Sequence, residues 1–138
     1  MVDELDAGET VTVEVVSEFV GWGFLRFFDL GDVSNPVEIG TFATDNTFNP
    51  DVANLGVWSV HNPEVVGSNL YASWYSDGVR VIDISQPARP REIGSWDGEG
   101  KPETAPPVFI WGVAPHGDLI LASDMNHGLY ILKVGPPR

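Results

Sequence analysis

The feature that most constrains the fold of this chain is an internal repeat. The segment from Arg26 to Phe42 aligns without a gap to the segment from Arg80 to Trp96, at an offset of 54 residues. A third, partial copy covers residues 119–132 and aligns with residues 69–82 at an offset of 50. A period of about 50 residues made of short strands predicts a fold in which one small sheet recurs along the chain.

Each copy predicts a sheet of antiparallel strands. Residues 56–96 form the complete copy, with strands expected at 56–60, 69–75, 79–84 and 91–96, and with a hairpin tip at Ser76-Asp77-Gly78, where Asp-Gly favours a tight turn. We expect Pro63 to end the first of these strands, because proline cannot donate to a strand ladder. The fold class is predicted as all-β, with β-propeller-type blades of four antiparallel strands.

The predicted organisation is a single domain over residues 10–134. Its blades cover about residues 10–42, 56–96 and 108–134, with further strands expected at 10–19, 22–30, 37–42, 108–113, 119–123 and 129–134. An acidic tail (1–9) precedes the domain and a short tail (135–138) follows it. A propeller closes with 4–8 blades, and this chain supplies only about 2.5, so an incomplete propeller is expected.

Residues 79–90 carry a specific motif, an apolar strand that ends in Asp and is followed by Ser-x-Pro-x-x-Pro. This motif resembles the LVIVD-repeat family of bacterial and archaeal β-propellers, over most of residues 20–134. The copy at 25–36 has Gly31-Asp-Val33 in place of Ser-x-Pro but keeps the last proline, and the third copy has Lys133 in place of the aspartate. The resemblance implies an extracellular or cell-surface protein and the C-terminal part of a longer propeller, but no single activity.

Composition excludes several classes of protein. The formal charge of −13 opposes binding to nucleic acid. It fits a solubilising surface, adaptation to high salt, or a surface that gathers cations. There are no cysteines for disulfides or thiolate metal sites. No apolar run is long enough for a transmembrane segment, and the acidic start at Met1 is unlike a signal peptide, which leaves the localisation open.

Residues that recur between copies are expected to serve the scaffold. The positions assigned to this role are Arg26, Asp29, Pro36, Trp58, Arg80, Asp83, Pro90 and Trp111. The arginines and aspartates would orient strands or tie blades together through charge-assisted hydrogen bonds. The two tryptophans, each at the start of a Trp-x-Val motif, are treated as equivalent and assigned to core or inter-blade packing.

Residues that occur in one copy only are freer to bind a ligand. Trp74, Tyr75 and Asp77 lie at the tip of the 69–84 hairpin, and His61 follows the strand expected at 56–60. Trp74 is expected to be exposed there and to offer a stacking surface. These four residues are the predicted ligand site of a non-enzymatic recognition module for a protein, a peptide or a glycan.

Two other readings stay open. His61, His116 and Asp124 would suit a divalent cation if they met at one channel mouth, which would make the protein a metal-dependent propeller hydrolase. Otherwise no cofactor and no catalytic residue is predicted. The chain could also be a fragment without independent function, whose open blade edges would pair into a homo-oligomer.

Overall fold

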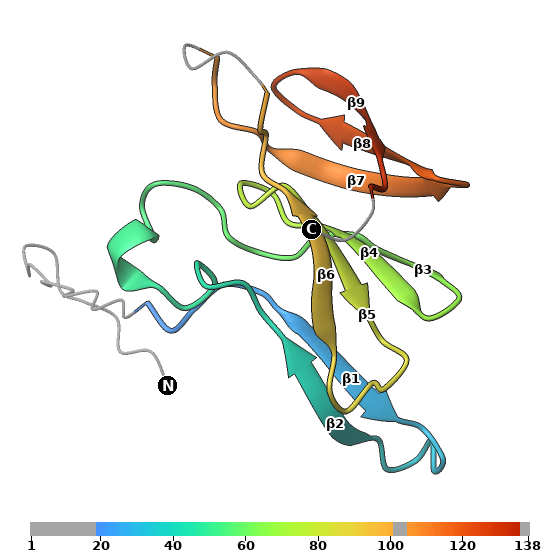
Figure 1. Cartoon of the computed structure of the whole chain (residues 1–138). Helices are drawn as coiled ribbons and strands as arrows, with labels where there is room; N and C mark the ends of the chain where they lie inside the picture. The colour runs from blue at the N-terminus through green and yellow to red at the C-terminus, as the bar shows by residue number, and fades with distance from the viewer. Residues whose placement is uncertain (1–18, 101–104, 136–138) are drawn as a thin grey trace, which may run out of the picture.

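The computed structural model describes residues 19–100 and 105–135, and these form an all-β protein (Figure 1). Three antiparallel sheets follow one another along the chain. They are β1 (Leu25–Asp29) with β2 (Val37–Phe42), then β3 (Pro63–Val66), β4 (Asn69–Ser73), β5 (Val79–Asp83) and β6 (Arg91–Trp96), then β7 (Ile110–His116), β8 (Leu119–Asp124) and β9 (Gly128–Lys133). A short 3-10 helix, η1 (Pro50–Val52), lies in the connection between the first two sheets.

The all-β prediction is therefore confirmed, and the sheets contain two, four and three strands. No sheet closes on itself within residues 19–100 and 105–135. The expected strand at 10–19 lies largely outside the described residues, as do the acidic tail 1–9 and positions 136–138 of the C-terminal tail. The one helix within the described ranges is a single turn, too short to cross a membrane.

The prediction of a strand at 56–60 is wrong. Those residues have no regular secondary structure, and the first strand of the four-stranded sheet is β3, which begins at Pro63. Pro63 is tolerated because it is the first residue of an edge strand, where its missing N–H is not needed for the ladder. Pro63 therefore marks the start of a strand, whereas it was expected to mark the end of one.

The repeats in the sequence correspond to matching strand registers. In the β1–β2 hairpin Leu25 pairs with Phe42 and the register shifts after Phe27. In β5–β6 the residues 54 positions later, Val79 and Trp96, pair in the same way, and the register shifts after Val81. The β4–β5 and β8–β9 hairpins match in the same manner at an offset of 50. The repeated sequence thus specifies the pairing of each hairpin.

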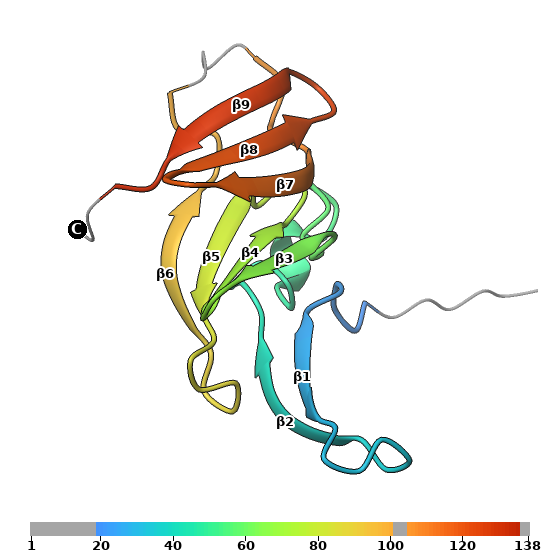
Figure 2. The same ribbon diagram turned by 90° about the vertical axis from the view of Figure 1, so that its right-hand side faces the viewer.

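The three sheets pack face to face, with β3–β6 between the other two (Figure 2). Because side chains alternate along a strand, each sheet has two faces. We call face A the side that carries Tyr71, Val79 and Val81 in β3–β6, and face B the side that carries Leu70, Ala72 and Ile82. Face A of the middle sheet packs against β7–β9, and face B packs against β1–β2.

The same two faces recur in the outer sheets. At the offset of 54, Leu25, Phe27 and Phe42 form face A of β1–β2, and they pack on the middle sheet. At the offset of 50, Ile120, Ala122 and Leu132 form face B of β7–β9, and they also pack on the middle sheet. Each contact between sheets therefore joins face A of one sheet to face B of the next.

Candidate functional site

The predicted ligand residues do not lie together at an exposed hairpin tip. Trp74 is fully buried, and its ring packs edge-on against Phe42 at 5.7 Å between centroids. Its indole N–H donates to the carbonyl of Trp58 at 2.9 Å. The expectation that Trp74 offers an exposed stacking surface is therefore wrong, because β1–β2 and the connection after β2 cover this end of the hairpin.

His61 and Tyr75 join the middle sheet to the third sheet. The His61 ring lies 4.2 Å from the Trp111 ring and 4.9 Å from the Tyr75 ring, and His61 Nδ1 bonds the carbonyl of Trp111. Tyr75 has a positive φ of 37°, which is unusual for a residue other than glycine, and it forms a bridge with Ile110 of β7. These two residues hold the sheets together rather than forming a free surface.

Trp58 and Trp111, predicted to be equivalent, are not. The strand registers pair Pro63 with Ala72 and Val113 with Ala122, so the counterpart of Trp111 at the offset of 50 is His61. Trp58 is half-buried outside any strand, and its indole N–H donates to the carbonyl of Val52 at 2.7 Å. Trp111 is 49% exposed, so it does not belong to the core, and of the two predicted roles its contacts with His61 and Tyr75 agree with packing between sheets.

The predicted metal ligands are separated. His116 ends β7 and is exposed, whereas His61 packs near the start of that strand, roughly 17 Å away at about 3.3 Å per residue. Asp124 is buried, and its carboxylate accepts from the backbone N–H groups of Phe109, Asn126 and His127 at 2.7–2.8 Å. Within the described ranges no group of three or more metal-binding side chains occurs.

The repeated charged residues make repeated contacts. Arg26 pairs with Glu38 across β1–β2, and Arg80 pairs with Glu92 across β5–β6, so the two ion pairs differ by the repeat offset.

The repeated aspartates cap the loops that follow β1 and β5. Asp29 accepts from the N–H of Gly31 at 2.8 Å, and Asp83 accepts from the N–H of Ser85 at 2.9 Å. Hydrogen bonds from Ser85, followed by Arg91, lower the pKa of Asp83 to about 2. Pro36 and Pro90 stand directly before β2 and β6, where these loops end.

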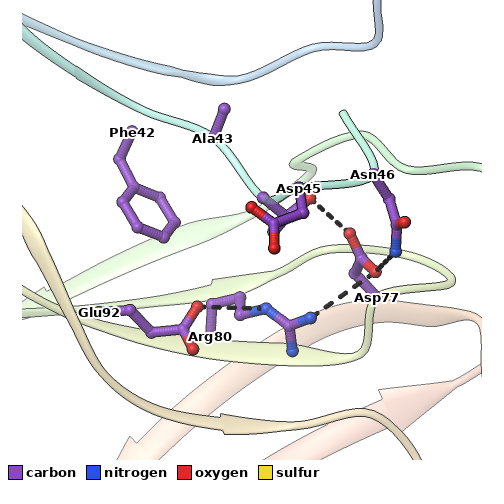
Figure 3. A pocket seen from close by; sticks show the side chains of 8 residues that line it. Phe42, Ala43, Asp45, Asn46, Asp77, Arg80 and Glu92 are labelled. Carbon is purple, nitrogen blue, oxygen red and sulfur yellow. Dashed lines mark hydrogen bonds and ion pairs between the residues drawn. The ribbon is translucent and has the colours of Figure 1, made fainter. Parts of the chain in front are cut away.

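Asp77 is the predicted ligand residue that does line a cavity. A pocket of about 380 Å³ lies between the middle sheet and the segment that follows β2 (Figure 3). We call it the Asp77 pocket. It is lined by Phe42, Ala43, Thr44, Asp45, Asn46, Asp77, Arg80 and Glu92. Its volume lies within the range of roughly 300–1,000 Å³ that is usual for small-ligand sites.

Local hydrogen bonds shape the inner wall of this pocket. Asp77 is 3% exposed, and its carboxylate accepts from the Thr44 hydroxyl and from the Asn46 amide, the latter at 2.7 Å. The guanidinium of Arg80 lies 3.6 Å from Asp77 and 3.4 Å from Glu92. Each buried charge therefore has a partner, which makes the inner wall preorganised.

The rim of the pocket carries uncompensated negative charge. Asp45 is exposed, its carboxylate points into the pocket, and it makes no hydrogen bond or ion pair with another described residue (Figure 3). The three carboxylates of Asp45, Asp77 and Glu92 face one guanidinium, that of Arg80. The ring of Phe42 supplies an apolar wall beside them. The arrangement is suited to a cation that also carries an apolar stem.

Sequence reasoning identified Asp77 but missed the other ligand-facing members of the pocket. Thr44, Asp45 and Asn46 lie in a polar segment between two predicted strands, and turn-forming residues carry no periodicity that predicts where their side chains point. The sequence signal that could have found them is that Thr44 and Asn46 align with Gly98 and Gly100 in the repeat and so occur in one copy only, whereas Asp45 aligns with another acidic residue, Glu99.

No protein-family model, no curated protein and no solved structure matches this chain.

Proposed function

We propose that this chain is a non-enzymatic recognition module that binds a basic side chain of a peptide or protein in the Asp77 pocket. The observation that carries the proposal is the Asp45 carboxylate, which points into a preformed pocket without a partner among the described residues. A lysine or arginine side chain would supply that partner. Its aliphatic stem would lie against Phe42, and its charge would face the aromatic ring and the carboxylates.

Two further features support a basic ligand. The pocket lies on a chain with a formal charge of −13, which draws cationic partners toward it by long-range attraction. The side chains that shape the inner wall are held by hydrogen bonds before any ligand arrives, so little ordering cost is paid on binding. A glycan would gain less here, since the stacking residue expected for it, Trp74, is buried.

The propeller architecture and the LVIVD-repeat assignment form part of this proposal. They are supported by the shared registers of β1–β2 with β5–β6 and of β4–β5 with β8–β9. In this architecture the strands form a constant frame, and the connections between sheets vary and bind the ligand. The Asp77 pocket is formed by such a connection, residues 43–46, together with the tip of a hairpin.

The test is a titration of fluorescently labelled tetra-arginine and tetra-lysine peptides, with a Gly-Ser peptide as the uncharged probe. Asp45→Asn should weaken binding of the basic peptides by about 5- to 10-fold, as expected for the loss of one partly exposed charge pair worth roughly 1 kcal/mol. Asp51→Asn is the matched control, because Asp51 is an exposed aspartate of η1 outside the pocket. Equal losses in both variants would show that the peptides sense only the overall charge, and the pocket would then be the wrong site.

A further inference from the structure

The outer side of β7–β9 has the same kind of face that two other sheets of this chain use to pack on a neighbouring sheet, but no described residue packs on it. Face A of β1–β2 packs on face B of the middle sheet, and face A of the middle sheet packs on face B of β7–β9. Face A of β7–β9 carries Leu121, Leu129 and Ile131, at the positions that Tyr71, Val79 and Val81 occupy in the middle sheet. Nothing described covers it, since Leu129 is 61% exposed and Ile131 is 63% exposed.

The polar groups of this face repeat the occupied interface as well. In the middle sheet Ser73 is fully buried, and its hydroxyl donates at 3.0 Å to the carbonyl of Trp111 on the neighbouring sheet. The equivalent residue, Ser123, is exposed, and its hydroxyl donates within its own sheet, to the carbonyl of Gly112 at 3.3 Å. Face A of β7–β9 thus keeps the hydroxyl that, in the middle sheet, donates to a backbone carbonyl of the neighbouring sheet.

The surface at this place is also hollowed. A groove of about 320 Å³ runs over face A of β7–β9, and Trp111, Leu121, Ser123 and Leu129 are among the residues that line it. At the matching positions of the middle sheet, the groove is filled by the third sheet itself, because His61, Tyr71, Ser73 and Val79 all contact or pack against that sheet. The groove therefore lies at the place where, on the middle sheet, the B face of a neighbouring sheet packs.

The chain itself offers such a face at its other end. Face B of β1–β2 carries Phe28, at the position of Ile82 in the middle sheet, and Leu30, which directly follows β1, is at the position of Ile84. Phe28 is 42% exposed and Leu30 is 58% exposed, whereas Ile82 is fully buried against a neighbour. We propose that face A of β7–β9 binds face B of β1–β2 from a second copy of this chain, in a head-to-tail arrangement.

This pairing differs from the joining of strand edges, and it has a definite symmetry. Two different surfaces meet, so the contact is heterologous, and it forms a ring or an open chain of copies according to the rotation that each contact adds. The Asp77 pocket lies between the middle sheet and the segment that follows β2, and none of its lining residues belongs to the two faces that we propose to meet. Self-association and ligand binding can therefore be tested separately.

The experiment measures molar mass by light scattering over a concentration series of the full chain. We expect the wild type to associate, and Ile131→Glu and Leu30→Glu each to reduce the mass to that of one copy. An equimolar mixture of the two variants should recover a dimer of limited size, since Leu30→Glu retains face A and Ile131→Glu retains face B. Val66→Glu is the matched control, because Val66 is 55% exposed at the tip of the β3–β4 hairpin and should leave the mass unchanged.

Salt provides an independent readout. Each copy carries a formal charge of −13, so copies repel one another and association should strengthen as NaCl is added. A wild type that stays at the mass of one copy at every concentration and salt level would overturn the proposal. So would a dimer that Ile131→Glu abolishes and Leu30→Glu does not, since that result would mean that two A faces meet.

Discussion

The middle and third sheets have hairpins with the same register and very different surroundings. Val79 of β5 is fully buried, whereas Leu129, its counterpart in the β8–β9 hairpin, is 61% exposed. At the hairpin tips Trp74 is fully buried in an apolar cluster, and its counterpart Asp124 binds backbone N–H groups. Equivalent backbone pairing therefore says little about burial, which depends on whether another sheet lies against that face.

The largest expected effect compares face B of the middle sheet with face B of the first sheet. Ile82→Ala should lower the free energy of unfolding by about 2–5 kcal/mol, because it opens a cavity in a fully buried cluster. Phe28→Ala, at the equivalent position, should cost under about 1 kcal/mol, since Phe28 is 42% exposed and gives up less burial. Urea denaturation of both variants measures this, and equal losses would mean that the first sheet is as well covered as the middle one.

The next comparison uses two turn glycines that differ by the offset of 50. Gly78 and Gly128 have φ values of +80° and +89°, so alanine is strained at both. A Cβ at Gly78 would lie 2.0 Å from the carbonyl oxygen of Trp96, whereas one at Gly128 would meet nothing within 4 Å. Gly78→Ala should therefore destabilise by about 1–3 kcal/mol more than Gly128→Ala in thermal or chemical unfolding. Equal losses of stability in the two variants would mean that the close approach of the Trp96 carbonyl does not restrict the residue at position 78.

A smaller difference is expected between the two repeated arginines. The Arg80 side chain is 12% exposed and neutralises Asp77, which is buried, so Arg80→Ala should cost about 1–2 kcal/mol. The Arg26 side chain is 55% exposed in its pair with Glu38, and Arg26→Ala should cost at most about 0.5 kcal/mol. Denaturant unfolding of both variants measures the loss of stability. A larger loss for Arg26→Ala than for Arg80→Ala would mean that burial of the arginine does not determine the strength of its ion pair.

The smallest effect is a dependence of stability on pH at Asp83. Its pKa in the folded protein is about 2, below the ordinary value of 3.8, so the unfolded chain binds the proton more tightly. The carboxylate therefore stabilises the fold above about pH 4, and this contribution is lost as the pH falls from about 4 to 2. The difference in the free energy of unfolding between wild type and Asp83→Asn, measured by denaturation, should shrink over this pH interval. A difference that stays constant would mean that ionisation of Asp83 does not stabilise the fold.

Much of the fold could be predicted because it is local. The bounds of β2 and β6 were predicted to the residue, since alternating apolar side chains and a preceding proline mark where each strand begins. The first strand of the middle sheet was misplaced because Pro63 begins β3, an edge strand, and an edge strand can start with proline. The predicted exposure of Trp74 was wrong for another reason. The burial of Trp74 depends on Phe42, which is 32 residues earlier in the chain and in another sheet.

By itself the sequence determined the all-β class, the recurring hairpins and the shared register of equivalent strands. These follow from turn residues and alternation within about 40 residues, where the interactions are short in sequence. Only the tertiary structure decided which faces are covered, that Asp77 lines a pocket with residues 43–46, and that His61 and Tyr75 join two sheets. These contacts join sheets that are distant in sequence. The repeated sequence pattern cannot predict them, because a hairpin has the same pattern whether or not another sheet packs on its face.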